Sequence, residues 1–195
     1  MAEDNQVRRR PIYRGKILDL GLETIALPNG EAAELEIARH PGGAAAVAID
    51  DHSRVCLLRQ YRHAAGGWLW ELPAGKLEPG EPPFDTARRE LFEEAGVTAE
   101  RWTELGILHS SPGILTEVIH LYLATDLGQA AHDHELHEVI EIHWLPFGQV
   151  LDWCRDGTVT DAKTLIGLFR AQAMRGNGFE MSDTGQSKCI PYDAP

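Results

Sequence analysis

The chain has 195 residues, with 18 Lys and Arg against 30 Asp and Glu, and a formal net charge of −12. Proteins that bind a nucleic-acid polymer need a basic surface, so this balance argues against such a partner. No apolar run is long enough to cross a membrane, and the N-terminus lacks the apolar core of an export signal. Three widely spaced cysteines, Cys56, Cys154 and Cys189, favour neither a disulfide framework nor a zinc site, so we expect a cytoplasmic protein.

The order of sequence patterns predicts a β-rich segment followed by a mixed domain. Residues 14–40 alternate in polarity around a Pro-Asn-Gly turn, which predicts a hairpin. Further strands are expected at 44–49, 54–61, 68–75, 103–110, 118–124 and 139–146. Helices are expected at 147–156 and 162–174, the second capped by Thr160 or Asp161. We therefore divide the chain into an N-terminal β-segment (1–40), a main domain (41–175) and a loosely ordered tail (176–195).

Residues 75–97 predict a loop and then a short helix that carries three carboxylates. Pro82 and Pro83 suit a helix start, where the missing backbone N–H would have no partner in any case. Gly96 suits the position just after the last turn. One side of the helix is apolar and is expected to be buried; it comprises Phe84, Ala87, Leu91 and Ala95. The opposite side carries Glu90, Glu93 and Glu94.

Carboxylates this close repel one another, and a hard cation such as Mg²⁺ would turn the repulsion into attraction. Taken alone, the three glutamates favour a solvated acidic face, which is what most glutamate-rich helices have. The full spacing is more specific: Gly, five residues, Glu, seven residues, Arg-Glu-apolar, one residue, Glu-Glu, one residue, Gly-apolar. A chance match has a probability on the order of one in a billion per window. The stretch resembles the Nudix box, and the chain therefore resembles a Nudix hydrolase.

The resemblance implies the Nudix fold over residues 41–175. This is an α/β (α+β) architecture in which a mixed β-sheet is sandwiched between helices. The β-segment before it resembles the small antiparallel sheet with which ADP-ribose pyrophosphatases of this superfamily form an intertwined homodimer. It could instead pack on its own subunit. The partners expected are a second copy of the chain and a small nucleoside diphosphate derivative, with neither nucleic acid nor membrane.

The resemblance also implies metal-assisted hydrolysis of a diphosphate, with Mg²⁺ or Mn²⁺ as the cation. The metal ligands would be Glu90, Glu94, a shared or bridging Glu93, and the backbone carbonyl of Ala74. Arg89 would orient a box glutamate through a charge-assisted hydrogen bond. Glu81 would add a ligand or fix the loop.

Two stretches outside the box also resemble the ADP-ribose pyrophosphatase branch. One is the pair of segments 59–62 and 71–75; the other is Pro112, which stands 16 positions after Gly96. A planar guanidinium suits a diphosphate, so Arg59 or Arg62 would hold substrate unless it pairs with an acidic neighbour. The substrate-binding residues implied are Arg59, Arg62, Glu71 and Pro112. The aromatic side chains nearby, which could stack an adenine or belong to the core, are Tyr61, Trp68 and Trp70.

The general base is expected from an acidic loop just before the strand at 139–146. The candidates are Glu138, Glu135 and Glu93, in that order, since a carboxylate that touches dications has a lowered pKa. Relatives often carry a tighter Glu/Asp pair here, whereas this loop interleaves its glutamates with histidines. The four histidines, His132, His134, His137 and His143, also allow a transition-metal site.

The expected activity is hydrolysis of ADP-ribose to AMP and ribose 5-phosphate. Another nucleoside-diphosphate sugar such as GDP-mannose is the alternative substrate. A sensor that binds ADP-ribose without cleaving it is disfavoured, because every box carboxylate is present. An enzyme for oxidised nucleoside triphosphates would share the box but not the N-terminal sheet.

Overall fold

The structure is a computed structural model that describes residues 7–129 and 140–176. Within these residues it contains ten β-strands, three α-helices and one short 3-10 helix, η1 (His63–Ala65). The strands are β1 (Arg8–Arg14), β2 (Asp19–Ala26), β3 (Ala32–Arg39), β4 (Gly43–Ala48), β5 (Arg54–Arg62), β6 (Gly67–Glu71), β7 (Ala74–Lys76), β8 (Val97–His109), β9 (Val118–Gln129) and β10 (Ile140–Pro146). The helices are α1 (Pro83–Ala95), α2 (Phe147–Asp156) and α3 (Ala162–Gly176).

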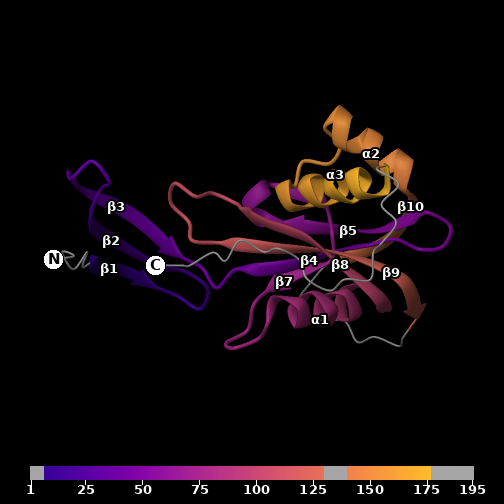
Figure 1. Cartoon of the computed structure of the whole chain (residues 1–195), viewed down its shortest axis with the longest axis horizontal. Coiled ribbons are helices and arrows are strands. Elements are labelled where there is room, and N and C mark those ends of the chain that lie inside the picture. The colour runs from indigo at the N-terminus through magenta and orange to yellow at the C-terminus, as the bar shows by residue number, and fades with distance from the viewer. Residues whose placement is uncertain (1–6, 130–139, 177–195) are drawn as a thin grey trace.

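The first three strands form a separate antiparallel sheet that projects from the rest of the molecule (Figure 1). A buried carboxylate ties them together. Glu23 on the central strand β2 accepts hydrogen bonds from Nε of Arg9 at 2.9 Å and from Nε of Arg39 at 3.0 Å. The turn between β2 and β3 contains Gly30 at a φ of 85°, a conformation that favours glycine. The predicted small N-terminal sheet is confirmed.

One boundary in this sheet was predicted wrongly. Residues 14–18 were expected to be extended, but β1 ends at Arg14 and the chain turns, with the N–H of Gly15 donating to the carbonyl of Leu18 at 2.8 Å. Strand β1 itself was not predicted, because its sequence, RRRPIYR, has no alternation of polar and apolar residues.

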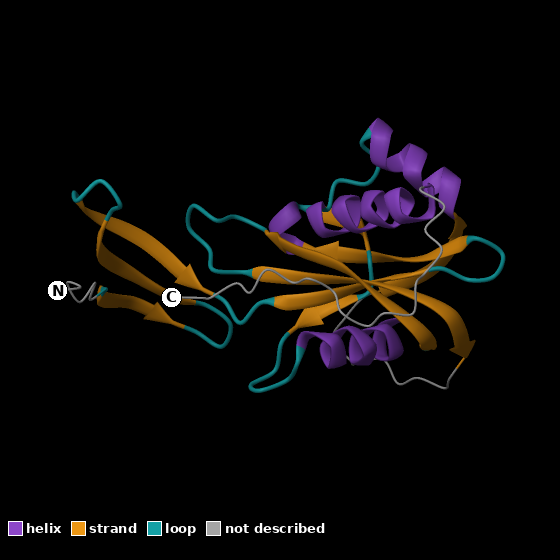
Figure 2. Ribbon diagram, in the orientation of Figure 1, coloured by secondary structure: helices purple, strands orange, loops and turns teal. Residues whose placement is uncertain are grey.

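The remaining strands form two sheets that lie between the helices, with orders β7-β4-β9-β8 and β10-β5-β6. Strands β4 and β9 run parallel, whereas the other described pairs in these two sheets are antiparallel. Helix α1 covers one side of the strands, and α2 and α3 cover the other (Figure 2). This arrangement confirms the predicted mixed sheet sandwiched between helices.

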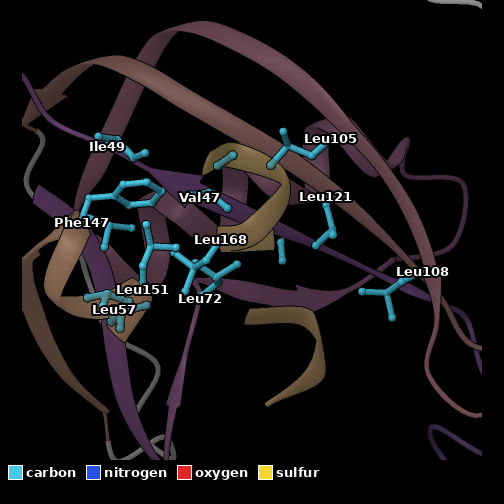
Figure 3. Packing of buried hydrophobic residues seen from close by; sticks show 14 residues of the cluster. Val47, Ile49, Leu57, Leu72, Leu105, Leu108, Leu121, Phe147, Leu151 and Leu168 are labelled. Carbon is cyan, nitrogen blue, oxygen red and sulfur yellow. The ribbon is translucent and has the colours of Figure 1, made fainter. Parts of the chain in front are cut away.

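Every residue of strand β4 is buried. Since successive side chains point to opposite sides of a sheet, both faces of the strand lie in the core. Val47 packs in a cluster that includes Leu57 of β5 and Leu168 of α3 (Figure 3). Its neighbour Ala46 belongs to the second cluster, which includes Leu91 of α1. Both cores therefore pack against one strand, and α1 is fixed against the sheet by its apolar side.

Several predicted boundaries agree with the structure. Helix α1 begins at Pro83 and is followed by Gly96 in the left-handed conformation, with a φ of 66°. Helix α2 has the predicted bounds, and α3 is capped by Asp161, whose Oδ2 accepts the N–H of Thr164 at 3.0 Å. None of the helices in the described ranges is long and apolar enough to cross a membrane.

Other expectations were wrong in detail. Phe84 was expected in the buried side of α1 but is 37% exposed, and its ring packs edge-on against Trp102 and Tyr122. The segment at 68–75 is two strands in different sheets, not one strand. Strand β8 begins directly after α1, six residues before the predicted start at 103.

Candidate active site

The box glutamates are positioned by a helix that is locked at both ends. Pro82 stands at the cap position, and the N–H of Gly96 donates to the carbonyl of Phe92 at 2.9 Å. Leu91 is fully buried beneath the helix. The carboxylates therefore project from a rigid element and not from a loop.

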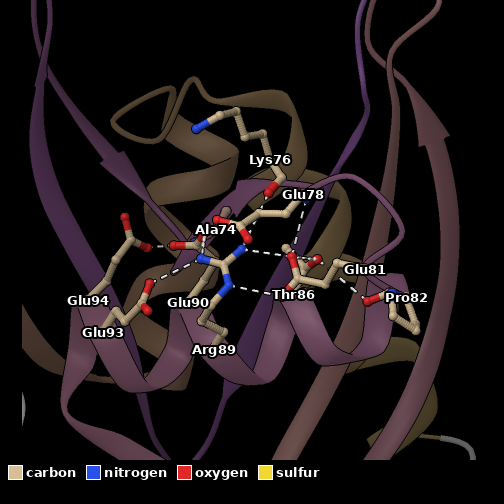
Figure 4. A network of polar contacts seen from close by, with 10 residues as sticks. All are labelled: Ala74, Lys76, Glu78, Glu81, Pro82, Thr86, Arg89, Glu90, Glu93 and Glu94. Carbon is tan, nitrogen blue, oxygen red and sulfur yellow. Dashed lines mark hydrogen bonds and ion pairs between the residues drawn. The ribbon is translucent and has the colours of Figure 1, made fainter. Parts of the chain in front are cut away.

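Arg89 lies at the centre of the site and contacts three carboxylates (Figure 4). Its Nε and one Nη donate to the two oxygens of Glu81, both at 2.9 Å. Its other Nη donates to Glu90 at 2.7 Å and to Glu93 at 3.0 Å. Bidentate pairing of this kind fixes both groups in one plane. Arg89 thus holds the loop and the helix in one arrangement, the orienting position expected from the sequence.

This pairing shifts the ionisation of the partners. The hydrogen bonds from Arg89 lower the pKa of Glu81 to about 2, with help from the hydroxyl of Thr86 at 2.8 Å. The same hydrogen bonds with Glu81 raise the pKa of Arg89 further above its usual range. Glu81 is therefore ionised and engaged in fixing the loop before α1.

Glu94 faces the strand side of the helix and not the solvent. It is 7% exposed, and its Oε2 accepts the backbone N–H of Ala74 at 2.7 Å. Glu90 lies against Gly75, where an added Cβ would come within 2.8 Å of its Cγ and closer still to its carboxylate. Gly75, the first glycine of the box, thus leaves room for the side chain of Glu90, and this contact explains why a glycine stands at that position.

The donor set suits a hard cation. Glu90, Glu93 and Glu94 supply oxygens from one helix beside the backbone of Ala74, and oxygen ligands are those that Mg²⁺ and Mn²⁺ prefer. In the described part of the chain, no group of three or more His, Cys, Asp or Glu side chains is arranged as a metal-binding site. Arg89 donates to two of the three carboxylates, and the N–H of Ala74 donates to the third. A cation here would compete with Arg89.

An open cleft with a volume of about 510 Å³ runs past these carboxylates. Residues from several elements line it, among them Ala74, Glu90, Glu93, Glu94, Arg62 and Lys163. The lining of the cleft thus combines cationic side chains with the acidic residues of α1. It is therefore suited to a ligand that is anionic and also binds a metal.

The predicted substrate residues differ in their positions. Arg62 lines the cleft, whereas Arg59, Glu71 and Pro112 are not among the residues that line it. The Arg59 guanidinium lies over the ring of Trp68, 5.4 Å from its centroid.

The three aromatic candidates also lie outside the lining of the cleft. Trp70 packs against Trp153 with ring centroids 5.2 Å apart, and Tyr61 meets Trp68 edge-on at 5.9 Å. Ring contacts also join Trp70 to His143 of β10, and the guanidinium of Arg59 lies over the rings of Trp68 and Trp70.

Glu71 is the centre of a second network, of which the sequence indicated only that Arg59 or Arg62 could pair with an acidic neighbour. Its side chain is 2% exposed and accepts two hydrogen bonds from Arg62, at 2.7 Å and 3.0 Å, and another from Lys163. Burial alone would raise the pKa of Glu71, but the bonds from Arg62 and the charge of Lys163 outweigh it and lower that pKa. A lysine in the first turn of a helix opposes the helix dipole, and this was the one available hint that Lys163 has a partner elsewhere.

The expected acidic loop lies outside the described residues. Glu135 and Glu138, the first two candidates for the general base, belong to it, as do His132, His134 and His137. His143 lies on β10, where its Nε2 is 3.4 Å from Glu141 and its ring meets Trp70 edge-on.

Comparison with known proteins agrees with this geometry. The NUDIX domain family matches residues 39–165. An ADP-ribose pyrophosphatase from Bacillus subtilis (strain 168) is 37% identical over 168 residues, covering 85% of this chain and 91% of the relative. Another ADP-ribose pyrophosphatase, from Mycobacterium tuberculosis (strain ATCC 25618 / H37Rv), is 34% identical over 179 residues, covering 89% of this chain and 86% of the relative.

The fold has a close structural counterpart as well. A crystal structure described as an ADP compounds hydrolase superposes with a TM-score of 0.75 and 21% sequence identity, covering 89% of this chain and 95% of the other. At this identity the likeness concerns the fold alone. The box spacing, the helix that carries it and the family match together show that the chain belongs to the NUDIX family.

Proposed function

We propose that the protein hydrolyses the diphosphate bond of ADP-ribose to give AMP and ribose 5-phosphate. The observation that carries the proposal is the grouping of Glu90, Glu93 and Glu94 in the lining of one cleft, which cationic side chains also line. The relatives named ADP-ribose pyrophosphatase, aligned over most of the chain, support this choice of substrate.

Each box residue receives a distinct task in this proposal. Glu90, Glu94 and the Ala74 carbonyl would hold Mg²⁺, or Mn²⁺ in its place, and Glu93 would share it. The bound cation neutralises diphosphate oxygens and lowers the pKa of the attacking water. Arg89 keeps Glu90 and Glu93 oriented, and Arg62 would contact the anionic substrate.

The proton of the attacking water needs a carboxylate that is not bound to the cation. We keep Glu138 as the first candidate, then Glu135 and Glu93. Single substitutions to Gln at the three positions would rank them, because the true base should lose kcat with KM nearly unchanged.

We also propose that residues 1–40 mediate a homodimer, with the family domain following over 41–175. The support is the projecting sheet β1-β2-β3 with the turn between β1 and β2 (Figure 1), which together expose several large apolar side chains; they are Ile12, Tyr13, Ile17, Leu18 and Leu35. Apolar side chains exposed on this small sheet and its first turn favour a protein partner, and a second copy of the chain is the simplest one.

A substrate panel tests the activity. ADP-ribose, GDP-mannose, NADH, a dinucleoside tetraphosphate and dGTP would each be incubated with and without Mg²⁺, with products separated by chromatography. The proposal predicts AMP from ADP-ribose in preference to the other products. A preference for GDP-mannose would move the assignment to that sugar nucleotide. Tight binding of ADP-ribose without any turnover would replace the enzyme with a sensor.

A further inference from the structure

We infer that Lys163 is a positioning residue for substrate binding: through Glu71 it fixes the guanidinium of Arg62 in the cleft. The inference rests on the proposed function, since it assigns to Arg62 a contact with the anionic substrate. The three side chains come from α3, β6 and β5, so the contact joins one helix to two neighbouring strands of one sheet.

The geometry of Glu71 supports this chain of contacts. Its Oε1 accepts Nε of Arg62, and its Oε2 accepts both an Nη of Arg62 and Nζ of Lys163. The carboxylate is 2% exposed, Lys163 is 13% exposed and Arg62 is 40% exposed. The buried anion thus pairs with the more buried Lys163 and, in a bidentate arrangement, with the half-buried Arg62.

Helix α3 contacts the end of β6 and the residue after it through two adjacent residues. Lys163 contacts Glu71, and the hydroxyl of the next residue, Thr164, accepts the N–H of Leu72 at 2.9 Å. Asp161 fixes both helix residues, since its oxygens accept Lys163 Nζ at 3.1 Å and the Thr164 hydroxyl at 2.6 Å. The first turn of α3 is therefore built to position the end of β6.

The charges explain why a lysine is needed. A buried carboxylate with a single cation partner is costly, and Arg62 is partly hydrated. Lys163 supplies the second cation, and Asp161 balances its charge. Without Lys163, Glu71 would turn toward water or take up a proton, and either change would release the guanidinium of Arg62.

Lys163→Met tests the inference, because it removes the charge and keeps most of the side-chain length. We expect KM for ADP-ribose to rise about tenfold with kcat within about twofold of wild type. Arg170→Met is the matched control: it removes a cation from the same helix that donates to the carbonyls of Leu105 and Ile107, both at 3.0 Å, away from the cleft. Its KM should stay within about twofold of wild type. An unchanged KM in Lys163→Met would overturn the inference.

A double-mutant cycle separates positioning from direct contact, since Lys163 itself lines the cleft. Glu71→Gln should raise KM by a similar factor, and adding Lys163→Met to it should change KM by less than about twofold. Effects that multiply in the double variant would show that Lys163 binds substrate directly, which contradicts the positioning role.

A spectroscopic measurement decides the question without any turnover. The Nε–H of Arg62, identified in an NMR spectrum by its loss in Arg62→Lys, should exchange with water at least about tenfold faster in Lys163→Met. An exchange rate equal to wild type would overturn the inference. A wild-type protein that fails to cleave ADP-ribose would refute the proposed function and leave this measurement as the test of positioning.

Discussion

The side chain of Glu90 fills the space that a Cβ on Gly75 would need: such a Cβ would lie 2.8 Å from Cγ of the glutamate and closer to its carboxylate. Gly75 begins the box and Glu90 follows 15 positions later, yet β7 and α1 bring them into contact. The glycine is therefore required by a side chain and not by its own backbone conformation. It permits a proposed metal ligand to lie directly against the strand.

Gly75→Ala should displace the Glu90 carboxylate, because the end of a flexible side chain can move more easily than the backbone. We expect kcat to fall at least about 100-fold, while the melting temperature changes by only a few degrees. Gly148→Ala on α2 is the control, since its Cβ would meet no atom within 4 Å and alanine favours a helix. Wild-type activity in Gly75→Ala would show that the position of Glu90 does not matter.

Glu94→Gln should abolish turnover and keep the fold. The amide oxygen can still accept the N–H of Ala74, and α1 is held by its buried apolar side. The loss of a charged metal ligand should reduce kcat about 1,000-fold or more, as measured by AMP release beside a thermal melt. Asp85→Asn, on the exposed part of the same helix, should be nearly silent. An unchanged rate in Glu94→Gln would remove this residue from the metal site.

The low pKa of Glu81 predicts an acid-dependent loss of stability. Its folded value of about 2 lies below the ordinary 4.5, so its contribution is complete above pH 4.5 and is lost as the pH falls toward 2. The difference in free energy of unfolding between wild type and Glu81→Gln should be constant from pH 7 to about 5 and shrink below that. Urea titrations across this pH range measure the difference in free energy of unfolding. Glu100→Gln, at an exposed position of β8, is the control. A difference that stays constant to pH 3 would refute the role of Arg89 as its partner.

The projecting sheet should control the oligomeric state. Ile12 is 52% exposed, and Ile12→Asp places a charge among the exposed apolar side chains of this region. Sedimentation velocity should show a dimer for wild type and a monomer for this variant. Phe169→Asp on α3, 39% exposed and far from the sheet, should remain dimeric. Deletion of residues 1–40 should also break the dimer, and a stable, active monomer after that deletion would contradict the intertwined arrangement.

Local signals in the sequence explain why α1 and its carboxylates could be predicted. Pro83 and Gly96 mark the ends of the helix through their own backbone preferences, and the structure agrees with both. The turn at residues 15–18 has no such marker beyond a single glycine, and the strand prediction failed there. Local pattern is thus reliable where the residue itself restricts the backbone.

The second network could not be predicted for a different reason. Lys163 and Glu71 are 92 positions apart, and nothing in either segment identifies the other. The place of Glu94 on the helix was predicted, but its hydrogen bond with the N–H of Ala74 was not, because only the fold brings the two residues together. Contacts between distant elements depend on tertiary packing, and a single sequence does not encode them in its periodicity.

The most direct test of the central claim is the Mg²⁺-dependent formation of AMP from ADP-ribose by wild type and Glu94→Gln side by side. The account predicts AMP and ribose 5-phosphate in equal amounts from wild type with Mg²⁺, and neither product with EDTA or with the variant. Equal AMP formation by wild type and variant, or formation that persists in EDTA, would contradict it.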